Sequence, residues 1–315
     1  MNIKSLLKRG FLFKLYKKFV PVCLSEIKDF STLYKNSLKV VKSYSSKSFN
    51  AENLDKKIIV SLTTYPKRIK SAGIAIASIM NQTYKADKIV LTLNEAQFPN
   101  HKFPKIIKKE IKAGLEIIWI KDDLRPHNKY FYAMQKYPED IIITIDDDDV
   151  YQQDLIETLI TSYKRYPNAI SCMLAKKIII NKDKIMPYNT WTINTPENIP
   201  STQLIALGIG GVLYPPNLIN KELFNATAIK KLGLKADDLW LKIMQIISTP
   251  PVKVVKAGKF HIGGQVPTSQ LTCLMDDNIG ARENDIQLRN IVNDYNAFVP
   301  PTHSIIEILH DKNLD

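Results

Sequence analysis

The sequence has few cysteines and few glycines, and each shortage excludes a class of site. Its 315 residues include three cysteines, Cys23, Cys172 and Cys273, which are widely separated and form no C-x-x-C pair. This excludes a disulfide framework and a structural zinc site, and it is typical of a reducing compartment. Only eleven glycines are present, and residues 64–67, after the first predicted strand, read Thr-Tyr-Pro-Lys. They offer no glycine loop to hold phosphates, which argues against a nucleotidyltransferase or a similar phosphate enzyme.

The sequence also lacks a long uninterrupted apolar run. Lysines break every apolar stretch in residues 3–24, so this segment cannot span a bilayer, which needs about 20 mostly apolar residues. It has neither the continuous apolar region nor the cleavage site of a signal peptide. Residues 203–220 contain no charge, but their glycines and prolines argue against a spanning helix. We predict a buried strand there, with Gly210 and Gly211 at a point where backbone approaches a ligand.

Positive charge is concentrated in the first fifty residues. The net charge is +13; residues 1–50 contain eleven Lys or Arg against Glu26 and Asp29, which is +9, and the remaining 33 against 29 give +4. A nucleic-acid-binding domain should carry its basic residues on the domain itself, so we predict no nucleic-acid partner. Leu7, Phe11 and Leu15, with Phe19, recur every four residues among the lysines. A helix of this kind either lies on an anionic membrane surface or packs on the domain.

Strand and helix patterns alternate from residue 56 onward. This alternation predicts an α/β fold with a mostly parallel sheet flanked by helices. The expected strands are residues 57–63, 87–93, 115–120, 141–145, 169–174 and 252–255, and the expected helices are 69–80, 128–135, 151–166, 236–248 and 286–298. We divide the chain into a basic amphipathic N-terminal arm (1–50), a catalytic domain (51–264), and a lid with a helical C-terminal extension (265–315), the lid following the Gly263-Gly264 pair.

Residues 140–149, Asp-Ile-Ile-Ile-Thr-Ile-Asp-Asp-Asp-Asp, carry the strongest chemical signal. A run of β-branched residues suits a strand buried on both faces, and α/β sheets bind ligands beyond the carboxyl ends of such strands. Four adjacent carboxylates repel one another unless a cation lies among them. Mg²⁺ or Mn²⁺ prefers oxygen ligands and can keep positions open for phosphates. The alternative is a solvated acidic turn.

Three stretches together resemble one enzyme family. They are Val60 to Arg68 (VSLTTYPKR), Ile145 to Asp149 (IDDDD) and Ala236 to Trp240 (ADDLW). Their order is similar to that in GT-A-fold glycosyltransferases, especially the family 2-like bacterial enzymes that build surface polysaccharide and lipooligosaccharide. The resemblance covers residues 57 to about 262. It implies a Rossmann-like GT-A domain that binds a nucleotide-sugar donor and a divalent metal.

The resemblance also assigns roles to the acidic residues. Asp146 and Asp148 match the metal-binding Asp-x-Asp pair, with Asp148 as direct ligand and Asp146 toward the ribose or the metal's waters. Asp147 and Asp149 form an equally possible pair, and Asp147 is also counted among the nucleotide-binding residues. Asp238 matches the catalytic base, supported by Asp237. The alternative for these two acids is stabilisation of a helix dipole.

Other residues are assigned to the nucleotide and the metal by the same resemblance. Thr63, Tyr65 and Arg68 would contact the base, ribose or phosphate, or simply form a strand-to-helix turn. Lys129 is favoured over the neighbouring His127 as a cation near the nucleotide, because lysine keeps its charge at neutral pH. His261 is a candidate metal ligand, although a lone histidine is often structural. Tyr188, Trp191, Tyr214 and Trp240 are either a sugar-stacking wall or core.

These observations predict a metal-dependent, inverting glycosyltransferase. We expect it to move a sugar from a nucleotide diphosphate donor, a UDP-sugar, to a glycan or lipid-linked acceptor in bacterial polysaccharide or lipooligosaccharide synthesis. The basic arm predicts peripheral association with the cytoplasmic face of the bacterial inner membrane. The alternative from a different functional class is a non-catalytic membrane scaffold. It would leave the aspartates at 146–149 and at 237–238 unexplained.

Overall fold

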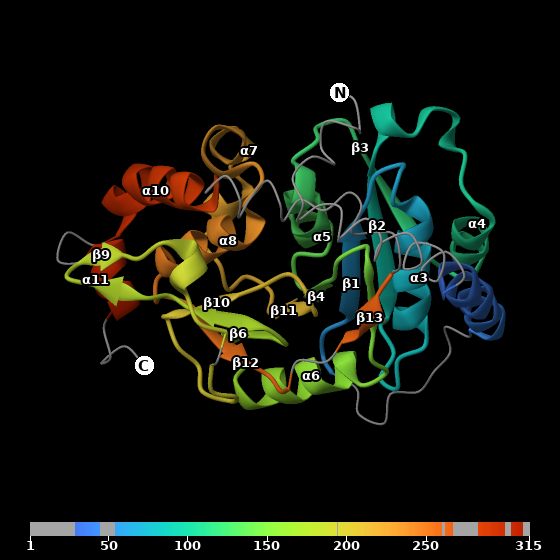
Figure 1. Ribbon diagram of the computed structural model, residues 1–315, viewed down its shortest axis with the longest axis horizontal. Coiled ribbons are helices and arrows are strands. Elements are labelled where there is room, and N and C mark those ends of the chain that lie inside the picture. Colours follow the sequence, from blue (N-terminus) through green and yellow to red (C-terminus); the bar gives the residue numbers. More distant parts are fainter. Residues whose placement is uncertain are drawn as a thin grey trace, which may run out of the picture.

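The computed structural model describes residues 29–44, 54–193, 195–259, 262–266, 283–299 and 304–310. Its centre is a seven-stranded sheet in the order β12-β6-β11-β4-β1-β2-β3 (Figure 1). All neighbours are parallel except β11, which runs antiparallel to both β4 and β6. The strands are β1 (Ile58–Thr63), β2 (Lys88–Asn94), β3 (Glu116–Ile120), β4 (Ile141–Thr144), β6 (Ala169–Cys172), β11 (Val212–Tyr214) and β12 (Lys253–Lys256).

Both faces of the sheet are covered, as its apolar strands require. Alternate residues of β1, Ile58, Val60 and Leu62, pack in one cluster with the helices α3 (Ile69–Met80), α4 (Lys105–Lys112) and α6 (Leu155–Arg165). Ile59 points the other way, toward Ala133 of α5 (Asn128–Lys136). The predicted α/β fold, with a mostly parallel sheet between helices, is therefore confirmed.

A second hydrophobic core lies beside the half of the sheet formed by β11, β6 and β12. Here α8 (Asp237–Ile246) packs with α10 (Glu283–Tyr295) and α11 (Ile305–His310), and the indole of Trp240 meets Tyr295 edge to face at 5.5 Å. The short helix α7 (Ala226–Ala228) precedes this region. Trp240, Tyr214 and Trp191 are all buried here. They are core residues, which leaves Tyr188 as the half-buried member of the suggested aromatic wall.

Three small two-stranded sheets complete the described part. The pairs are β5 (Asp149–Tyr151) with β13 (Ile262–Gln265), β7 (Ala175–Lys177) with β10 (Leu204–Ala206), and β8 (Ile180–Asn181) with β9 (Lys184–Ile185). The uncharged stretch 203–220 therefore forms two short strands, β10 and β11, on either side of a glycine turn in which Gly210 and Gly211 have positive φ.

Two sequence expectations about helices need correction. The helix expected from Tyr151 begins at Leu155, because Tyr151 is still extended and pairs with β13 in the small sheet. The lysine-rich helix α4 was not predicted, since only Ile106, Ile107 and Ile111 mark its apolar side.

Some predicted features lie outside the described residues. These are the first 28 residues of the arm, His261, and residues 267–282, where the lid was placed. A helix over residues 29–43 is described and packs on α3 and α4 through Val41. None of the described helices is long and apolar enough to cross a membrane.

Candidate active site

The acidic stretch follows β4 and passes through a bend at Asp147 and Asp148 into β5, and burial alternates along its four carboxylates. Asp147 and Asp149 are buried, with 7% and 1% of their surface exposed, whereas the Asp146 and Asp148 side chains keep 31% and 16%. Asp146 and Asp148 are therefore the pair that can reach a ligand. The hydroxyl of Tyr151 accepts a hydrogen bond from the Asp146 backbone at 2.8 Å and helps to fix this turn.

Arg68, immediately before α3, neutralises one side of the acidic stretch. Its guanidinium lies 3.0 Å from an Asp147 oxygen and 3.1 Å from an Asp148 oxygen. The hydroxyl of Thr64 donates to the other Asp147 oxygen. Burial raises the pKa of Asp147 to about 6, and Arg68 and Thr64 oppose that rise. The loop after β1 thus holds the buried acids in place.

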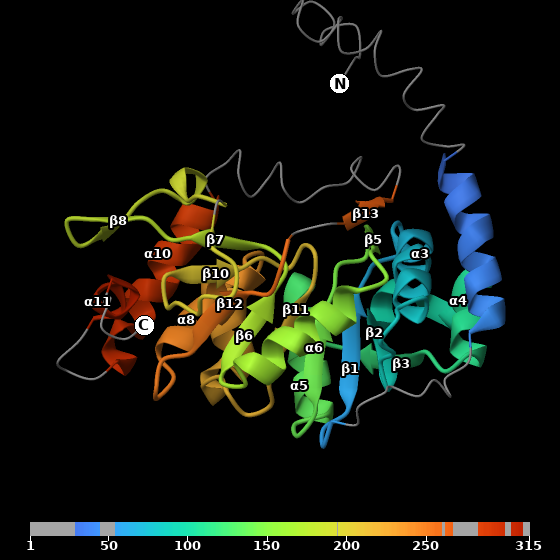
Figure 2. The ribbon, with the colours of Figure 1, turned by 90° about the horizontal axis from the view of Figure 1, so that it is seen from below.

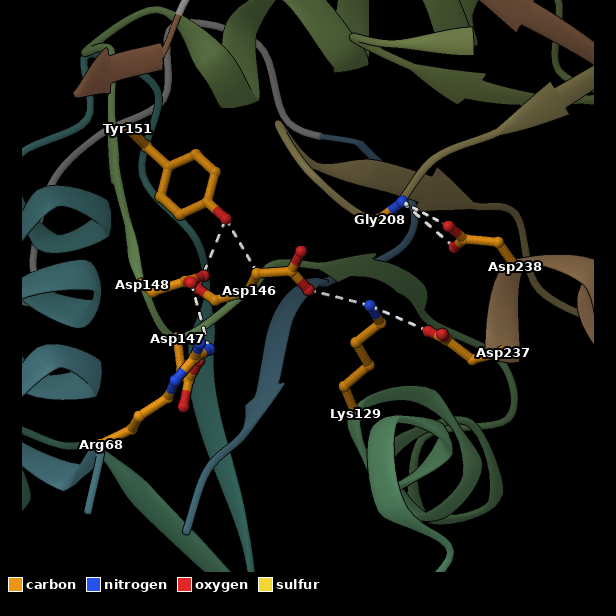
Figure 3. Close-up of polar contacts among 9 residues, drawn as sticks. All are labelled: Arg68, Lys129, Asp146, Asp147, Asp148, Tyr151, Gly208, Asp237 and Asp238. Atoms are coloured by element: carbon orange, nitrogen blue, oxygen red, sulfur yellow. Dashed lines mark hydrogen bonds and ion pairs between the residues drawn. The ribbon is translucent and has the colours of Figure 1, made fainter. Parts of the chain in front are cut away.

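Lys129 lies between the two acidic groups (Figure 3). Its ammonium contacts a carboxylate oxygen of Asp146 and one of Asp237, each at 2.9 Å. Only 8% of the Lys129 side chain is exposed. Burial alone would lower its pKa, but the charges of Asp146, Asp237 and Asp238 raise the pKa well above the usual value. One buried cation therefore connects the end of β4 to the start of α8.

Asp238 has a different environment from Asp237. Both Asp238 oxygens accept from the backbone N–H of Gly208, at 3.1 and 3.3 Å. Burial and the neighbouring Asp237 charge raise the pKa of Asp238 to about 8. Gly208 fits tightly: a Cβ there would lie 2.5 Å from the Lys129 ammonium and 3.5 Å from oxygens of Asp146 and Asp238. This glycine lets the acids of β4 and α8 face one another across a narrow gap.

The predicted loop residues separate into two groups. Arg68 and Lys129 contact the acids, as above. Thr63 instead donates to the Thr92 carbonyl of β2 at 2.9 Å, and Tyr65 lies beside the Arg68 guanidinium, 5.9 Å from ring centre to carbon. His127 is fully buried and bonds the Tyr130 hydroxyl and the Gly233 carbonyl, each at 2.8 Å. Burial lowers its pKa to about 4, so His127 is a neutral structural residue.

Three residues of this site were missed by sequence reasoning. Thr64 lies inside the VSLTTYPKR stretch, but strand alternation would have shown only that it points away from Thr63. Gly208 was passed over in favour of Gly210 and Gly211, although all three belong to the same glycine-rich turn. Tyr151 was placed on a helix, which hid its contact with Asp146.

The donor set suits part of a divalent metal site. Carboxylate oxygens are the preferred ligands of Mg²⁺ and Mn²⁺, and Asp146 and Asp148 are the two accessible ones. Within the described residues, no three His, Cys, Asp or Glu side chains are grouped so as to hold a metal by themselves. The other ligands would have to come from a bound phosphate and water, as is common for Mg²⁺.

The family is decided by comparison with known sequences. Residues 60–226, more than half of the chain, match the model of glycosyl transferase family 2. The chain belongs to glycosyl transferase family 2. No curated protein matches the sequence. The family match includes Arg68, Lys129, Asp146, Asp148 and Gly208, whereas Asp237 and Asp238 lie beyond its end.

Comparison with solved structures bears on the fold, at low sequence identity. A mannosyltransferase from Pyrobaculum calidifontis, in complex with GDP-Man and Mn²⁺, is 12% identical with a TM-score of 0.50, over 92% of this chain and 78% of that one. A 4-diphosphocytidyl-2C-methyl-D-erythritol synthase from Anaerococcus prevotii is 15% identical (TM-score 0.42; 73% and 96% covered). A glucosyl-3-phosphoglycerate synthase from Mycobacterium tuberculosis, with Mn²⁺ and UDP, is 13% identical (0.29; 38% and 43%). Only the first is similar enough to indicate a shared fold, and this GT-A fold confirms the expected architecture.

Proposed function

We propose that this family 2 protein is a metal-dependent, inverting glycosyltransferase that moves a hexose from a nucleotide diphosphate donor, a UDP-sugar, to a hydroxyl of a glycan or lipid-linked acceptor. The observation that carries this proposal is the pairing of two acidic groups across one buried lysine. Asp146 and Asp148 lie at the end of β4, Asp238 lies at the start of α8, and Lys129 connects the two sides. One side suits a charged leaving group, and the other suits removal of a proton.

Asp146 and Asp148 would hold Mn²⁺ or Mg²⁺ beside the donor diphosphate. Such a cation, when bound, neutralises charge on the leaving nucleotide as its bond to the anomeric carbon breaks. Arg68 lies 3.1 Å from Asp148 and keeps that carboxylate in position. With Tyr65 it would also contact the nucleotide, because a guanidinium binds phosphate well.

Asp238 would accept the proton of the attacking acceptor hydroxyl. A leaving diphosphate needs no acid, so a single base is enough for direct displacement at the anomeric carbon, with inversion. The Gly208 N–H fixes the Asp238 carboxylate, and the neighbouring Asp237 is held by Lys129. Because the pKa of Asp238 is raised to about 8, its ionised form is a stronger base than an ordinary carboxylate.

The basic arm supports our proposal for the acceptor and the place of action. Residues 1–50 carry a net charge of +9 and interleave large apolar residues with lysine. We propose that they associate with the anionic cytoplasmic face of a bacterial inner membrane, where lipid-linked glycans of polysaccharide and lipooligosaccharide are built.

The decisive experiment measures donor hydrolysis and sugar transfer by the purified protein across a panel of nucleotide sugars, with Mn²⁺, with Mg²⁺ and with EDTA. We expect one donor to be consumed only with metal. Asp148→Ala should reduce its turnover to below about 1%, because the metal's contribution is several kcal/mol. Asp154→Ala is the matched control, since Asp154 is exposed and lies outside the site. Full activity in EDTA, or in Asp148→Ala, would refute the metal role, and pyrophosphate release from nucleoside triphosphates would point to nucleotidyl transfer instead.

A further inference from the structure

The end of the molecule farthest from α10 and α11 carries a concentration of lysines. The helix over residues 29–43 and α4 lie side by side there, as both ribbon views show (Figures 1 and 2). Val41 belongs to the same apolar cluster as Ile106 and Ile107, and the Ile106 N–H donates to the Tyr34 hydroxyl at 3.3 Å. The two helices therefore present one continuous outer surface.

That surface is lined by eight lysines, which we call the lysine face. Three stand on the first helix at spacings of four and three residues, and five lie on α4 or just before it. All are exposed except Lys109, which is half-buried: Lys35, Lys39, Lys42, Lys102, Lys105, Lys108, Lys109 and Lys112. Within the part of the chain that the structure describes, none of the eight forms an ion pair.

The two helices provide almost no negative charge to compensate. The only acids in residues 29–43 and 102–112 are Asp29 and Glu110. Glu110 is 0% exposed, and neither of its oxygens has a hydrogen-bond partner. Burial raises its pKa well above the usual value, which favours the uncharged form of this carboxyl group. The eight lysine charges at this end of the fold therefore attract anions from solution.

We propose that the lysine face is a docking surface for anionic lipid headgroups, so that the folded domain binds the membrane as well as the arm. The proposal extends the membrane association suggested above, but it does not depend on the chemistry of the active site. Ile111, 37% exposed beside Lys108 and Lys112, adds an apolar contact. Lysine stems can lie along the headgroup layer while their ammonium groups meet phosphates.

A bilayer fits this surface better than a nucleic acid does. The chain entering the first helix interleaves Leu7, Phe11 and Leu15 with lysines, and such apolar groups gain free energy in a lipid interface but not against a phosphate backbone. The N-terminal end of this helix lies toward the same side of the molecule as β5 and β13 (Figure 2). Docking here would bring the edge that carries Asp146 and Asp148 close to lipid-linked substrates.

The test is binding of the full chain to vesicles of phosphatidylcholine with and without phosphatidylglycerol. Four α4 lysines are changed together, Lys105, Lys108, Lys109 and Lys112→Gln. The matched control changes four exposed lysines elsewhere, Lys121, Lys182, Lys184 and Lys221→Gln, with the same loss of charge. A surface lysine contributes about fivefold to binding of an anionic membrane. We expect the α4 variant to bind phosphatidylglycerol vesicles at least about tenfold more weakly, and the control to lose less than about twofold.

Donor hydrolysis in solution should be unchanged in both variants, because neither set of lysines contacts the active site. Failure of this docking proposal is therefore distinguishable from failure of the proposed transferase activity. Equal losses in the two variants would show that only net charge matters and would overturn the proposal, as would unchanged binding in the α4 variant. Binding of duplex DNA but not of phosphatidylglycerol vesicles would identify the wrong class of partner.

Discussion

The two acidic groups of the site contain the same residue type but receive unequal amounts of positive charge. At the end of β4, Arg68 contacts Asp147 and Asp148, and Lys129 contacts Asp146. At the start of α8, among the described residues, Lys129 forms an ion pair with Asp237 but not with Asp238, and Asp238 accepts its hydrogen bonds from the Gly208 N–H. The first group is therefore suited to binding charged ligands. The second keeps one carboxylate free of direct cation contact.

This difference shows how aspartates in two parts of one site can serve different chemistry, ligand binding in one group and proton transfer in the other. A neighbouring cation lowers the pKa of a carboxylate, whereas burial raises it, so a buried carboxylate without direct cation contact can exchange a proton near neutral pH. Asp237 and Asp238 are adjacent, yet the pKa of Asp237 is lowered and that of Asp238 rises to about 8. For Asp237, burial raises the pKa, but the Lys129 charge, together with His127 and the hydrogen bonds to this carboxylate, outweighs that rise.

The largest effect should come from removing the proton acceptor. Asp238→Asn keeps the shape of the side chain but cannot take a proton at neutral pH. We expect the transfer rate to fall about 100- to 10,000-fold, the usual contribution of a general base, while metal-dependent nucleotide binding is retained. Isothermal calorimetry and a transfer assay separate the two, with Asp154→Asn as control. A variant that transfers at the wild-type rate would show that the two groups do not divide the work.

Removing the shared cation should break the connection between the groups. Lys129→Ala leaves Asp146 and Asp237 without their partner, and Asp237 is buried. Loss of one member of a buried ion pair costs about 3–5 kcal/mol of unfolding free energy. Urea unfolding at neutral pH with EDTA measures it. The control is Lys136→Ala, whose half-exposed ammonium pairs with Glu116 at 2.6 Å and should contribute less than about 1 kcal/mol. Equal costs in the two variants would argue against a buried cationic bridge.

The pH dependence of turnover distinguishes the two groups by sign. Asp238 is protonated below its pKa of about 8 and ionised above it. Because only the ionised form accepts a proton, kcat/KM should rise about tenfold per pH unit up to pH about 8 and then level off. Asp238→Asn should lose this slope. A profile that is flat between pH about 6 and 9 would contradict the assigned role.

Much of the fold was predictable because local patterns and the buried sheet agree. The helix predicted for residues 69–80 has the bounds of α3, Ile69–Met80, because its apolar spacing is regular. The predicted start of the next helix at Tyr151 was wrong, because Tyr151 belongs to strand β5, which pairs with β13. That pairing joins segments about a hundred residues apart, so no local pattern could show it.

The site was predictable as a set of acids but not as a network. The run of four aspartates was evident in the sequence, but its register followed only from the structure, which buries Asp147 and Asp149 and leaves Asp146 and Asp148 partly exposed. The partners of those acids come from distant segments. Gly208 donates to Asp238 across thirty residues, and Lys129 spans more than a hundred to reach Asp237. Such contacts depend on how strands and helices cross, which residue spacing does not encode. The assigned roles of Asp238, Asp148 and His261 stay predictions.

The smallest expected effect concerns Glu110, which lies outside the site. It tests the premise that burial raises the pKa of a carboxyl group. Glu110 is fully buried, and among the described residues neither of its oxygens has a hydrogen-bond partner. Its pKa is raised mainly by burial, as that of Asp238 is. Burial raises its pKa in the folded chain, while the unfolded chain releases the proton near the ordinary value of 4.5. The folded state therefore holds more protons above that pH, and the contribution of this group to stability falls as pH rises, by about 1.4 kcal/mol per unit until the folded pKa is reached. Glu110→Gln stays neutral at every pH, so it should unfold at higher urea concentration than the wild type at pH about 8, with the difference shrinking toward pH about 5. If the two proteins respond to pH in parallel, burial without a cation does not keep this acid protonated, and the same reasoning about Asp238 loses its support.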